Sequence, residues 1–273
     1  MNILITGAGS YVGTSVERWI KNHSNYRVDT LDMLKDTWRD TDFSIYDVVY
    51  HVAGIAHVNA KANMEALYYK VNRDLTIEVA QKAKAAGVKQ FIFMSSMIVY
   101  HESRSLKPEM ITTDTQPCPN GFYGDSKLQA EKGLHELECD TFKVCILRPP
   151  MIYGKGSKGN FPRLIKLAAK TPLFPDFHNQ RSMLYIDNLA EFVLQAVNRQ
   201  LSGTFYPQNR ELSDTVEIIR YFAKWLNPFV RLASYFLQPI NKMFGTYYYA
   251  PQMSQMPFEY QLVSFEQSLK HIL

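Results

Sequence analysis

Two side chains that could transfer a proton, Tyr123 and Lys127, lie four residues apart in the segment Phe-Tyr-Gly-Asp-Ser-Lys. On a helix this spacing places both side chains on one face. A phenol has a pKa of about 10, which is too high for a base near neutral pH, but an adjacent ammonium favours the phenolate. Tyr123 could then take a proton from a hydroxyl group and later return it. The same pair could also be an ordinary stripe on a surface helix.

A serine hydroxyl stands at the end of a short apolar run. Residues 91–94 read Phe-Ile-Phe-Met and are followed by Ser95 and Ser96. In open α/β sheets, groups that contact a ligand gather outside the carboxyl ends of the strands. Ser96 could there hydrogen-bond a reacting oxygen and share its proton. The alternative is a serine that satisfies the local backbone.

A glycine-rich turn opens the chain. Gly7, Gly9 and Gly13 follow the apolar run 3–6 and precede a helix pattern formed by Val12, Val16, Trp19 and Ile20. Glycines let a backbone turn sharply and approach a pyrophosphate, and the start of the helix offers N–H groups and partial positive charge. A strand before and a helix after strengthen this interpretation, against the alternative of an ordinary turn between strand and helix.

Asp32 lies 19 residues after Gly13, at the end of a second predicted strand. An acid there can accept hydrogen bonds from an adenosine ribose and would repel a 2′-phosphate. We therefore expect NAD as the cofactor in preference to NADP, although Lys35 and Arg39 nearby weaken the preference, so NADP is not excluded. A plain surface aspartate is the alternative. A bound nicotinamide would add a second positive charge near Tyr123 and favour its phenolate further.

Strand and helix signals alternate through the first half of the chain. Apolar runs predict strands at 3–6, 27–31, 46–52, 91–94 and 142–147. Helices are predicted at 67–86, ended by Gly87, and at 122–137. Continuous apolar strands separated by helices indicate a parallel sheet covered on both faces. The predicted fold class is therefore α/β, a Rossmann-type doubly wound sheet.

The amino-acid composition of the chain changes after Pro149 and Pro150. Residues 154–182 are rich in Gly, Pro, Lys and Asn and contain one predicted helix, 161–169. We expect a dinucleotide-binding domain at 1–153, to which 182–203 returns, and a small substrate-binding lobe from 154–181 and 204–273. The aromatic segment 229–244 fits either an interfacial membrane helix or, preferably, the core of this lobe.

Composition excludes several classes of protein. Among 273 residues, 30 basic and 26 acidic side chains give a net charge of +4, and the basic residues are scattered, so nucleic acid is not an expected partner. Three cysteines without a Cys-x-x-Cys pair suggest neither a disulfide framework nor zinc, and the spacing of His51 and His57 fits no metal template, so no metal is expected. The sequence contains no run of about 18 apolar residues, the length that a membrane-spanning helix needs, so we expect no stable membrane insertion. Without a recognisable signal peptide, we expect a cytoplasmic protein.

Taken together and in this order, the motifs resemble those of the extended short-chain dehydrogenases/reductases of the NAD-dependent epimerase/dehydratase family. The resemblance covers residues 1 to about 200 and continues more weakly to the end. It is carried by the segments 6–13, 47–54, 95–96, 123–127, 148–154 and 185–188, together with Asp32, Asn72 and Arg181.

The resemblance implies roles for individual residues. Ser96 matches a substrate-orienting serine, Tyr123 the acid/base, and Lys127 the residue that binds the nicotinamide ribose and tunes the tyrosine. Asn160 and Arg181 match positions that hold the diphosphate of a nucleotide sugar, and a planar, permanently charged guanidinium suits that group. Cofactor contacts are implied for Gly7, Gly9, Ser10, Tyr11, Val12, Gly13, Asp32, Val52, Ala53, Gly54, Asn72, Tyr123, Lys127, Pro149 and Pro150. Family members often pair as homodimers through the helices predicted at 67–86 and 122–137.

Three departures from the family pattern bear on function. Ser10 stands where a middle glycine is usual, and His101 where a glycine often follows the tyrosine. Met97 and Ile98 occupy the places of the Asp-Glu pair that eliminates water in 4,6-dehydratases. Neither side chain can transfer a proton, which argues against a dehydratase. The expected activity is an NAD-dependent UDP-sugar 4-epimerase. A 4-ketoreductase of a UDP- or dTDP-4-keto-6-deoxy sugar is the alternative, and a non-catalytic nucleotide-sensing module is less favoured.

Overall fold

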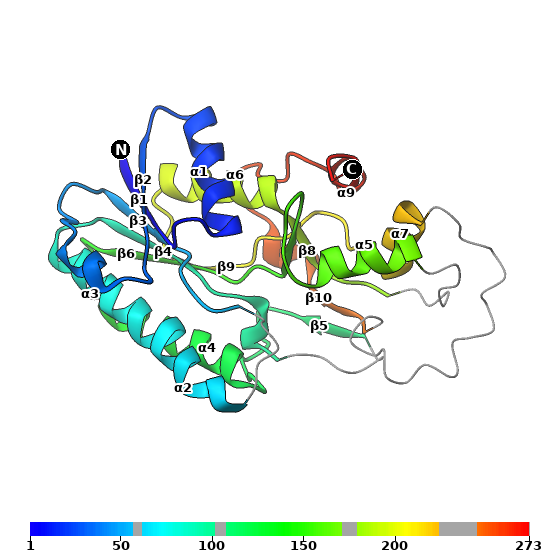
Figure 1. Ribbon diagram of the computed structural model, residues 1–273, viewed down its shortest axis with the longest axis horizontal. Coiled ribbons are helices and arrows are strands. Elements are labelled where there is room, and N and C mark those ends of the chain that lie inside the picture. The colour runs from blue at the N-terminus through cyan, green and yellow to red at the C-terminus, as the bar shows by residue number, and fades with distance from the viewer. Residues whose placement is uncertain (57–61, 102–107, 171–178, 224–244, 273) are drawn as a thin grey trace.

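A six-stranded parallel sheet forms the centre of the molecule (Figure 1). The computed structural model describes all residues except 57–61, 102–107, 171–178, 224–244 and 273. The strands, in sheet order, are β2 (Arg27–Leu31), β1 (Asn2–Thr6), β3 (Val48–His51), β4 (Gln90–Met94), β6 (Lys143–Leu147) and β9 (Gly203–Phe205). The five strands predicted from apolar runs are all present, with ends that differ by at most two residues.

Helices cover both faces of this sheet. Helices α1 (Tyr11–His23) and α6 (Ile186–Asn198) lie on one face, and α3 (Leu75–Ala85) and α4 (Phe122–Leu137) on the other (Figure 1). Alternation along β1 explains the two cores, since Ile3 and Ile5 pack with Val16 of α1 while Leu4 faces the opposite layer. The predicted doubly wound fold is confirmed.

The order of the strands creates a topological switch point between β1 and β3. The chain passes from β1 outward to β2 and then returns across β1 to β3. The connection from β2 contains a short 3₁₀ turn, η1 (Asp36–Asp40), whose Trp38 is buried under the sheet. Ligands of open α/β sheets bind outside the carboxyl ends of the strands at such a point.

The single helix predicted at 67–86 is wrong in detail. The structure has α2 (Glu65–Tyr68), a π-helical turn η3 (Tyr69–Asp74) and α3, which follow one another without a break. The physical reason is a set of long-range hydrogen bonds. The turn carries the buried Asn72, whose side-chain amide is hydrogen-bonded to the backbone of Ile55 in the loop after β3 and to the hydroxyl of Ser126 in α4. Such π-turns are frequent at functional sites. The predicted end of the helix is confirmed by Gly87, which has a positive φ of 83°.

Smaller elements are appended at one end of the sheet. Two-stranded sheets pair β5 (Glu109–Ile111) with β10 (Tyr247–Tyr249) and β7 (Met151–Tyr153) with β8 (Met183–Tyr185). Helix α5 (Asn160–Lys170) confirms the helix predicted at 161–169. The rest are α7 (Thr215–Phe222), α9 (Phe265–Lys270) and the short 3₁₀ turns η2 (Ala62–Met64), η4 (Met97–Val99) and η7 (Pro251–Ser254).

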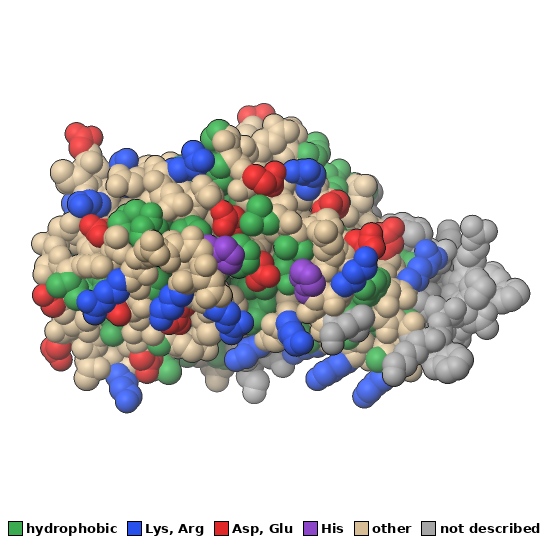
Figure 2. All heavy atoms as spheres, turned by 90° about the horizontal axis from the view of Figure 1, so that it is seen from above, with side chains coloured by type: hydrophobic (Ala, Val, Ile, Leu, Met, Phe, Trp, Pro, Cys, Tyr) green, Lys and Arg blue, Asp and Glu red, His purple; other side chains and the backbone are tan. Residues whose placement is uncertain are grey.

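The domain division at 153 and 203 and the pairing of two copies stay predictions. Residues 229–244, for which two environments were considered, lie outside the described part of the chain. Among the described residues, no helix combines the length and apolar character needed to span a bilayer. The face that carries α1 and α6 shows basic and acidic side chains interspersed with apolar ones (Figure 2).

Candidate active site

The glycine-rich turn packs tightly against the loop after β3. Gly7 has a φ of 91°, and a Cβ placed on it would lie only 2.9 Å from the backbone nitrogen of Ala53. The backbone N–H of Gly7 donates a 2.9 Å hydrogen bond to the carbonyl of Leu31 at the end of β2. Only glycine combines this conformation with so close an approach. The turn therefore joins the carboxyl ends of β1, β2 and β3 at the switch point.

Ser10, the departure from the family's glycine pattern, is the N-cap of α1. Its Oγ accepts a 3.1 Å hydrogen bond from the backbone N–H of Gly13, which is the ordinary role of a serine at this position. Gly9 beside it has a φ of 72° and open space where a Cβ would stand. The backbone at Gly9 is therefore uncovered on that side, next to the N-terminus of a 13-residue helix.

Asp32 follows β2 directly and is exposed. Its Oδ1 accepts a 2.9 Å hydrogen bond from the backbone N–H of Leu34. Its neighbour Leu31 is the residue that holds Gly7. The carboxylate therefore lies at the sheet edge of the glycine-rich turn, where a ribose hydroxyl could reach it.

Ser96, Tyr123 and Lys127 come together at the carboxyl end of β4. Tyr123 is the second residue of α4 and is hydrogen-bonded to Ser96. Nζ of Lys127 donates a 2.8 Å hydrogen bond to the carbonyl of Met94, the last residue of β4. The oxygen of Ser96 also accepts a 3.3 Å hydrogen bond from the N–H of Ile98, so it caps η4 as well. The side chain of Ser96 therefore both satisfies the local backbone and contacts Tyr123.

The charge states of the two groups are set by burial. Burial raises the pKa of Tyr123 to about 12, against the effect of the hydrogen bond with Ser96. Burial lowers the pKa of Lys127 to about 8, although the carboxylate of Glu131 acts in the opposite direction. Because desolvation outweighs the hydrogen bond with Ser96, the pKa of the phenol lies above its ordinary value, and the lowering expected from Lys127 together with a bound nicotinamide stays a prediction.

Three residues come into close contact at the loop that follows β3, namely Gly54, Asn72 and Lys127. A Cβ on Gly54 would lie 3.2 Å from Nζ of Lys127 and 3.0 Å from Oδ1 of Asn72. The amide of Asn72 accepts a 2.8 Å hydrogen bond from the N–H of Ile55 and donates one of 3.1 Å to its carbonyl. Asn72 has no exposed surface. It therefore supports the loop after β3 from behind, and the direct cofactor contact that the resemblance implies stays a prediction.

The remaining predicted site residues lie on segments that flank this centre. Pro149 and Pro150 are buried after β6, and the carbonyl of Pro149 accepts a 2.9 Å hydrogen bond from the N–H of Met97. Asn160 is exposed at the start of α5. Arg181 forms β-bridges with Ser213 and Tyr247, and its Nε donates a 3.1 Å hydrogen bond to the carbonyl of Gly245. Burial lowers the pKa of Arg181.

Two charged residues that sequence reasoning did not assign lie beneath the site. Glu131 and Arg148 form a buried ion pair of 2.5 Å, and Ser95 donates a hydrogen bond to Glu131. One signal was available, because Glu131 is four residues after Lys127 and so lies on the same face of α4. Tyr68, whose ring meets that of Tyr123 edge-on with centroids 5.9 Å apart, was also missed.

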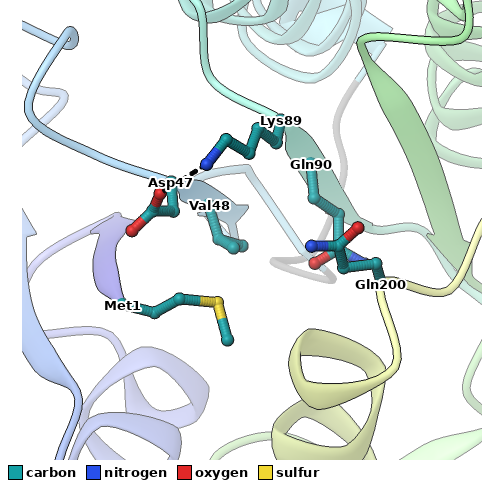
Figure 3. Close-up of a pocket in the computed structure, with 6 residues that line it drawn as sticks. All are labelled: Met1, Asp47, Val48, Lys89, Gln90 and Gln200. Carbon is teal, nitrogen blue, oxygen red and sulfur yellow. Dashed lines mark hydrogen bonds and ion pairs between the residues drawn. The ribbon is translucent and has the colours of Figure 1, made fainter.

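In the part of the chain that the structure describes, the other candidate sites carry no comparable arrangement. His51 is fully buried and hydrogen-bonded through Nδ1 to Thr6 and through Nε2 to Thr76, and His57 lies outside the described residues. Among the described residues, no three His, Cys, Asp or Glu side chains cluster to hold a metal. A pocket at the opposite, amino-terminal ends of the strands is lined by Met1, Asp47, Val48, Lys89, Gln90 and Gln200 (Figure 3).

Comparisons with known proteins agree with this geometry. The family model described as "NAD dependent epimerase/dehydratase family" matches residues 3–206. A UDP-glucose 4-epimerase of Vibrio cholerae is 32% identical over 246 residues, which cover 81% of this chain and 75% of that protein.

Two solved structures share the fold over the whole chain. The UDP-glucuronic acid 4-epimerase of Bacillus cereus, in complex with NAD, has a TM-score of 0.76 at 21% identity and covers 99% of this chain and 97% of its own. The dTDP-4-dehydrorhamnose reductase of Bacillus anthracis, in complex with NADP, has a TM-score of 0.75 at 20% identity and covers 99% and 98%.

Proposed function

Because the chain belongs to the NAD-dependent epimerase/dehydratase family, we propose that it inverts the C4 hydroxyl of a UDP-linked sugar. It is an enzyme of the extended short-chain dehydrogenase/reductase type. The observation that carries the proposal is the meeting of Ser96, Tyr123 and Lys127 at the end of β4. This is where a ligand of such a sheet binds.

We propose that Tyr123 is the acid/base. Its Oη would take the proton of the C4 hydroxyl and return it later, while Oγ of Ser96 holds the same sugar oxygen. Burial raises the pKa of Tyr123, and the hydrogen bond with Ser96 acts in the opposite direction, toward the form that accepts a proton. Lys127 would hold the nicotinamide ribose and add positive charge near the phenol.

The glycine-rich turn fits the dinucleotide that the family uses. Gly7 closes the turn against Ala53, Gly9 leaves space, and the start of α1 supplies N–H groups. We propose that Ser10 to Gly13, Asp32 and Val52 to Gly54 hold the adenosine and pyrophosphate half, with Pro149 and Pro150 near the nicotinamide. Held by these residues, NAD would supply the reversible hydride chemistry at C4.

We propose that Arg181 and Asn160 hold the diphosphate of the substrate. The guanidinium of Arg181 is in a setting that lowers its pKa through burial, and a desolvated cation attracts an anionic group more strongly than one in water. Asn160 begins the 11-residue helix α5, so an anion near it would face a helix N-terminus.

The residues after Ser96 argue for a reaction without loss of water. Met97 is buried and Ile98 is apolar. A dehydratase needs a carboxyl pair to move the protons of the eliminated water, and neither side chain can do so. Oxidation and reduction at one carbon require, besides a hydride carrier, only one acid/base, the role that we propose for Tyr123.

The proposal is tested with a panel of UDP-hexoses and 4-keto-6-deoxy sugar nucleotides, while NAD(P)H absorbance and product sugars are followed together. An epimerase interconverts two UDP-hexoses with no net change of the cofactor. Stoichiometric consumption of NAD(P)H with a 4-keto sugar would assign a 4-ketoreductase instead. Binding of nucleotide sugars without any turnover would point to a nucleotide-sensing module.

A further inference from the structure

A buried ion pair lies directly beneath the proposed active site. Nη2 of Arg148 is 2.5 Å from Oε2 of Glu131, and Nε of Arg148 lies 3.1 and 3.2 Å from the two carboxylate oxygens. The side chains are only 10% and 2% exposed. Burying two charges is costly, and removing one partner leaves the other uncompensated. A pair in this position therefore calls for a function beyond stability.

The pair connects the three segments that carry the proposed site. Glu131 belongs to α4, which also bears Tyr123 and Lys127, and Ser95 at the end of β4 donates a hydrogen bond to it. Arg148 follows β6 and immediately precedes Pro149. Nη1 of Arg148 donates a 3.0 Å hydrogen bond to Oη of Tyr100, beyond η4. One charged cluster thus joins a helix to two strand ends.

Glu131 also acts electrically on Lys127. The two residues are one turn apart on the same face of α4, and both are buried. Burial lowers the pKa of Lys127, and the carboxylate of Glu131 raises it. Two further titratable side chains among the described residues bear on Lys127. His51 from β3 is kept neutral by burial and by the charge of Lys127, and Tyr123 lies one turn earlier on α4. Among the described residues, Glu131 is the carboxylate that supports the ammonium.

We propose that Glu131, held in place by Arg148, is a positioning residue that sets its carboxylate one helical turn from Lys127 to support the ammonium and fixes α4 against the ends of β4 and β6. This inference rests on the proposed roles of Lys127 and Tyr123. Arg148 acts indirectly, through Glu131. Burial lowers the pKa of Arg148, but the hydrogen bonds and charge of Glu131 outweigh burial and raise that pKa above its ordinary value. Without the guanidinium, the carboxylate of Glu131 loses the ion pair that fixes its position relative to Lys127.

The test compares pH profiles of wild type, Glu131→Gln, Arg148→Gln, Arg148→Lys and Ser95→Ala. Two quantities are measured at each pH: kcat/KM for the UDP-sugar and the dissociation constant of NAD from quenching of protein fluorescence. In the wild type, kcat/KM should fall and the dissociation constant of NAD should rise as the pH increases through about 8, where Lys127 is expected to lose its proton. We call this change on the alkaline side of the profile the basic limb. Glu131→Gln and Arg148→Gln should each lower the pH of its midpoint by about one pH unit. The double variant Glu131→Gln/Arg148→Gln should lower it no further.

Two variants separate charge from shape. Arg148→Lys keeps a cation beside Glu131, so its basic limb should stay at the wild-type pH even if its rate falls. Ser95→Ala removes a hydrogen bond but leaves the ion pair, and its limb should also stay. If Glu131→Gln does not fold, as judged by thermal unfolding, the contrast between Arg148→Lys and Arg148→Gln decides the question.

The outcomes distinguish this inference from the proposed function. Uniformly lower kcat/KM in Glu131→Gln and Arg148→Gln, with the basic limb unmoved, would overturn the inference and leave the pair as scaffold only. A wild type that binds NAD with the expected limb but epimerises no UDP-sugar would overturn the proposed function while the NAD-binding profiles still test the pair.

Discussion

Lys127 of α4 donates a 2.8 Å hydrogen bond from Nζ to the backbone oxygen of Met94, the last residue of β4. The contact ties the start of the helix to the carboxyl end of a central strand. Tyr123 lies one turn earlier on the same helix, and Ser96 lies two residues after Met94. This hydrogen bond therefore holds the helix that carries Tyr123 against the strand end that leads to Ser96, the two groups that we propose to act on the sugar.

Replacing Tyr123 by Phe removes the proposed proton carrier with little change in volume. The ring contact with Tyr68 can persist, so the fold and NAD binding should be retained. Turnover should fall by at least about 10²-fold, as measured by conversion of a UDP-hexose. Tyr69→Phe is the matched control, because its hydroxyl bonds Asp125 at 2.7 Å away from Ser96. Near-normal turnover in Tyr123→Phe would remove the acid/base assignment.

Replacing Gly7 by Ala should weaken both the fold and NAD binding. Gly7 and Gly87 have φ values of 91° and 83°, but only at Gly7 would a Cβ meet a neighbouring backbone, at 2.9 Å from Ala53. Gly87→Ala should cost about 1–2 kcal/mol of unfolding free energy for its left-handed conformation, and Gly7→Ala should cost more. Urea unfolding and NAD titration measure the two effects. Equal losses in both variants would contradict the close packing at the switch point.

Replacing Asp32 by Ala should relax the choice between NAD and NADP. The exposed carboxylate can accept hydrogen bonds from the ribose, and such charged bonds contribute about 1.5–3 kcal/mol. NAD affinity should therefore fall about tenfold or more, while NADP affinity should not fall, because repulsion of the 2′-phosphate is lost. Asp36→Ala, which breaks an exposed pair with Arg39, is the control. An unchanged ratio of the two dissociation constants would argue that Asp32 is only a surface residue.

Breaking the Glu131–Arg148 pair from one side should be far more damaging than replacing both residues. Arg148→Met or Glu131→Leu alone should lower the unfolding free energy by about 3–5 kcal/mol, because each leaves a buried charge unpaired. The double variant should recover most of that loss. Denaturant unfolding checks the cycle, with Glu266→Gln in the exposed pair with Lys270 as a control that changes little. Additive losses would contradict a coupled buried pair.

His51 should make the protein sensitive to acid. Burial and the charge of Lys127 lower its pKa to about 3, against an ordinary value of about 6.5. Between these values the unfolded chain binds a proton that the folded chain does not, so stability present above pH 6.5 is lost as the pH falls, at about 1.4 kcal/mol per unit. His51→Gln should flatten this slope by one proton in urea unfolding at pH 4–7, whereas the exposed His23→Gln should not. Parallel slopes for His51→Gln and wild type would contradict a buried neutral histidine.

Local pattern determined much of this protein. The apolar runs predicted the five strands, and the spacing of Tyr123 and Lys127 indicated a shared helix face, which α4 (Phe122–Leu137) bears out. These features depend on neighbours within a few turns, so the order of residues is enough to reveal them. The glycine-rich turn is of the same kind, because a positive φ at Gly7 is a property of one residue.

Tertiary structure alone decided the rest. The strand order that puts β1 between β2 and β3, the π-turn around Asn72, and the pairing of Glu131 with Arg148 join residues far apart in the chain. The pKa of Tyr123 belongs here too. The direction of its shift follows from the burial of the phenol by segments distant in the chain, which no spacing of residues expresses.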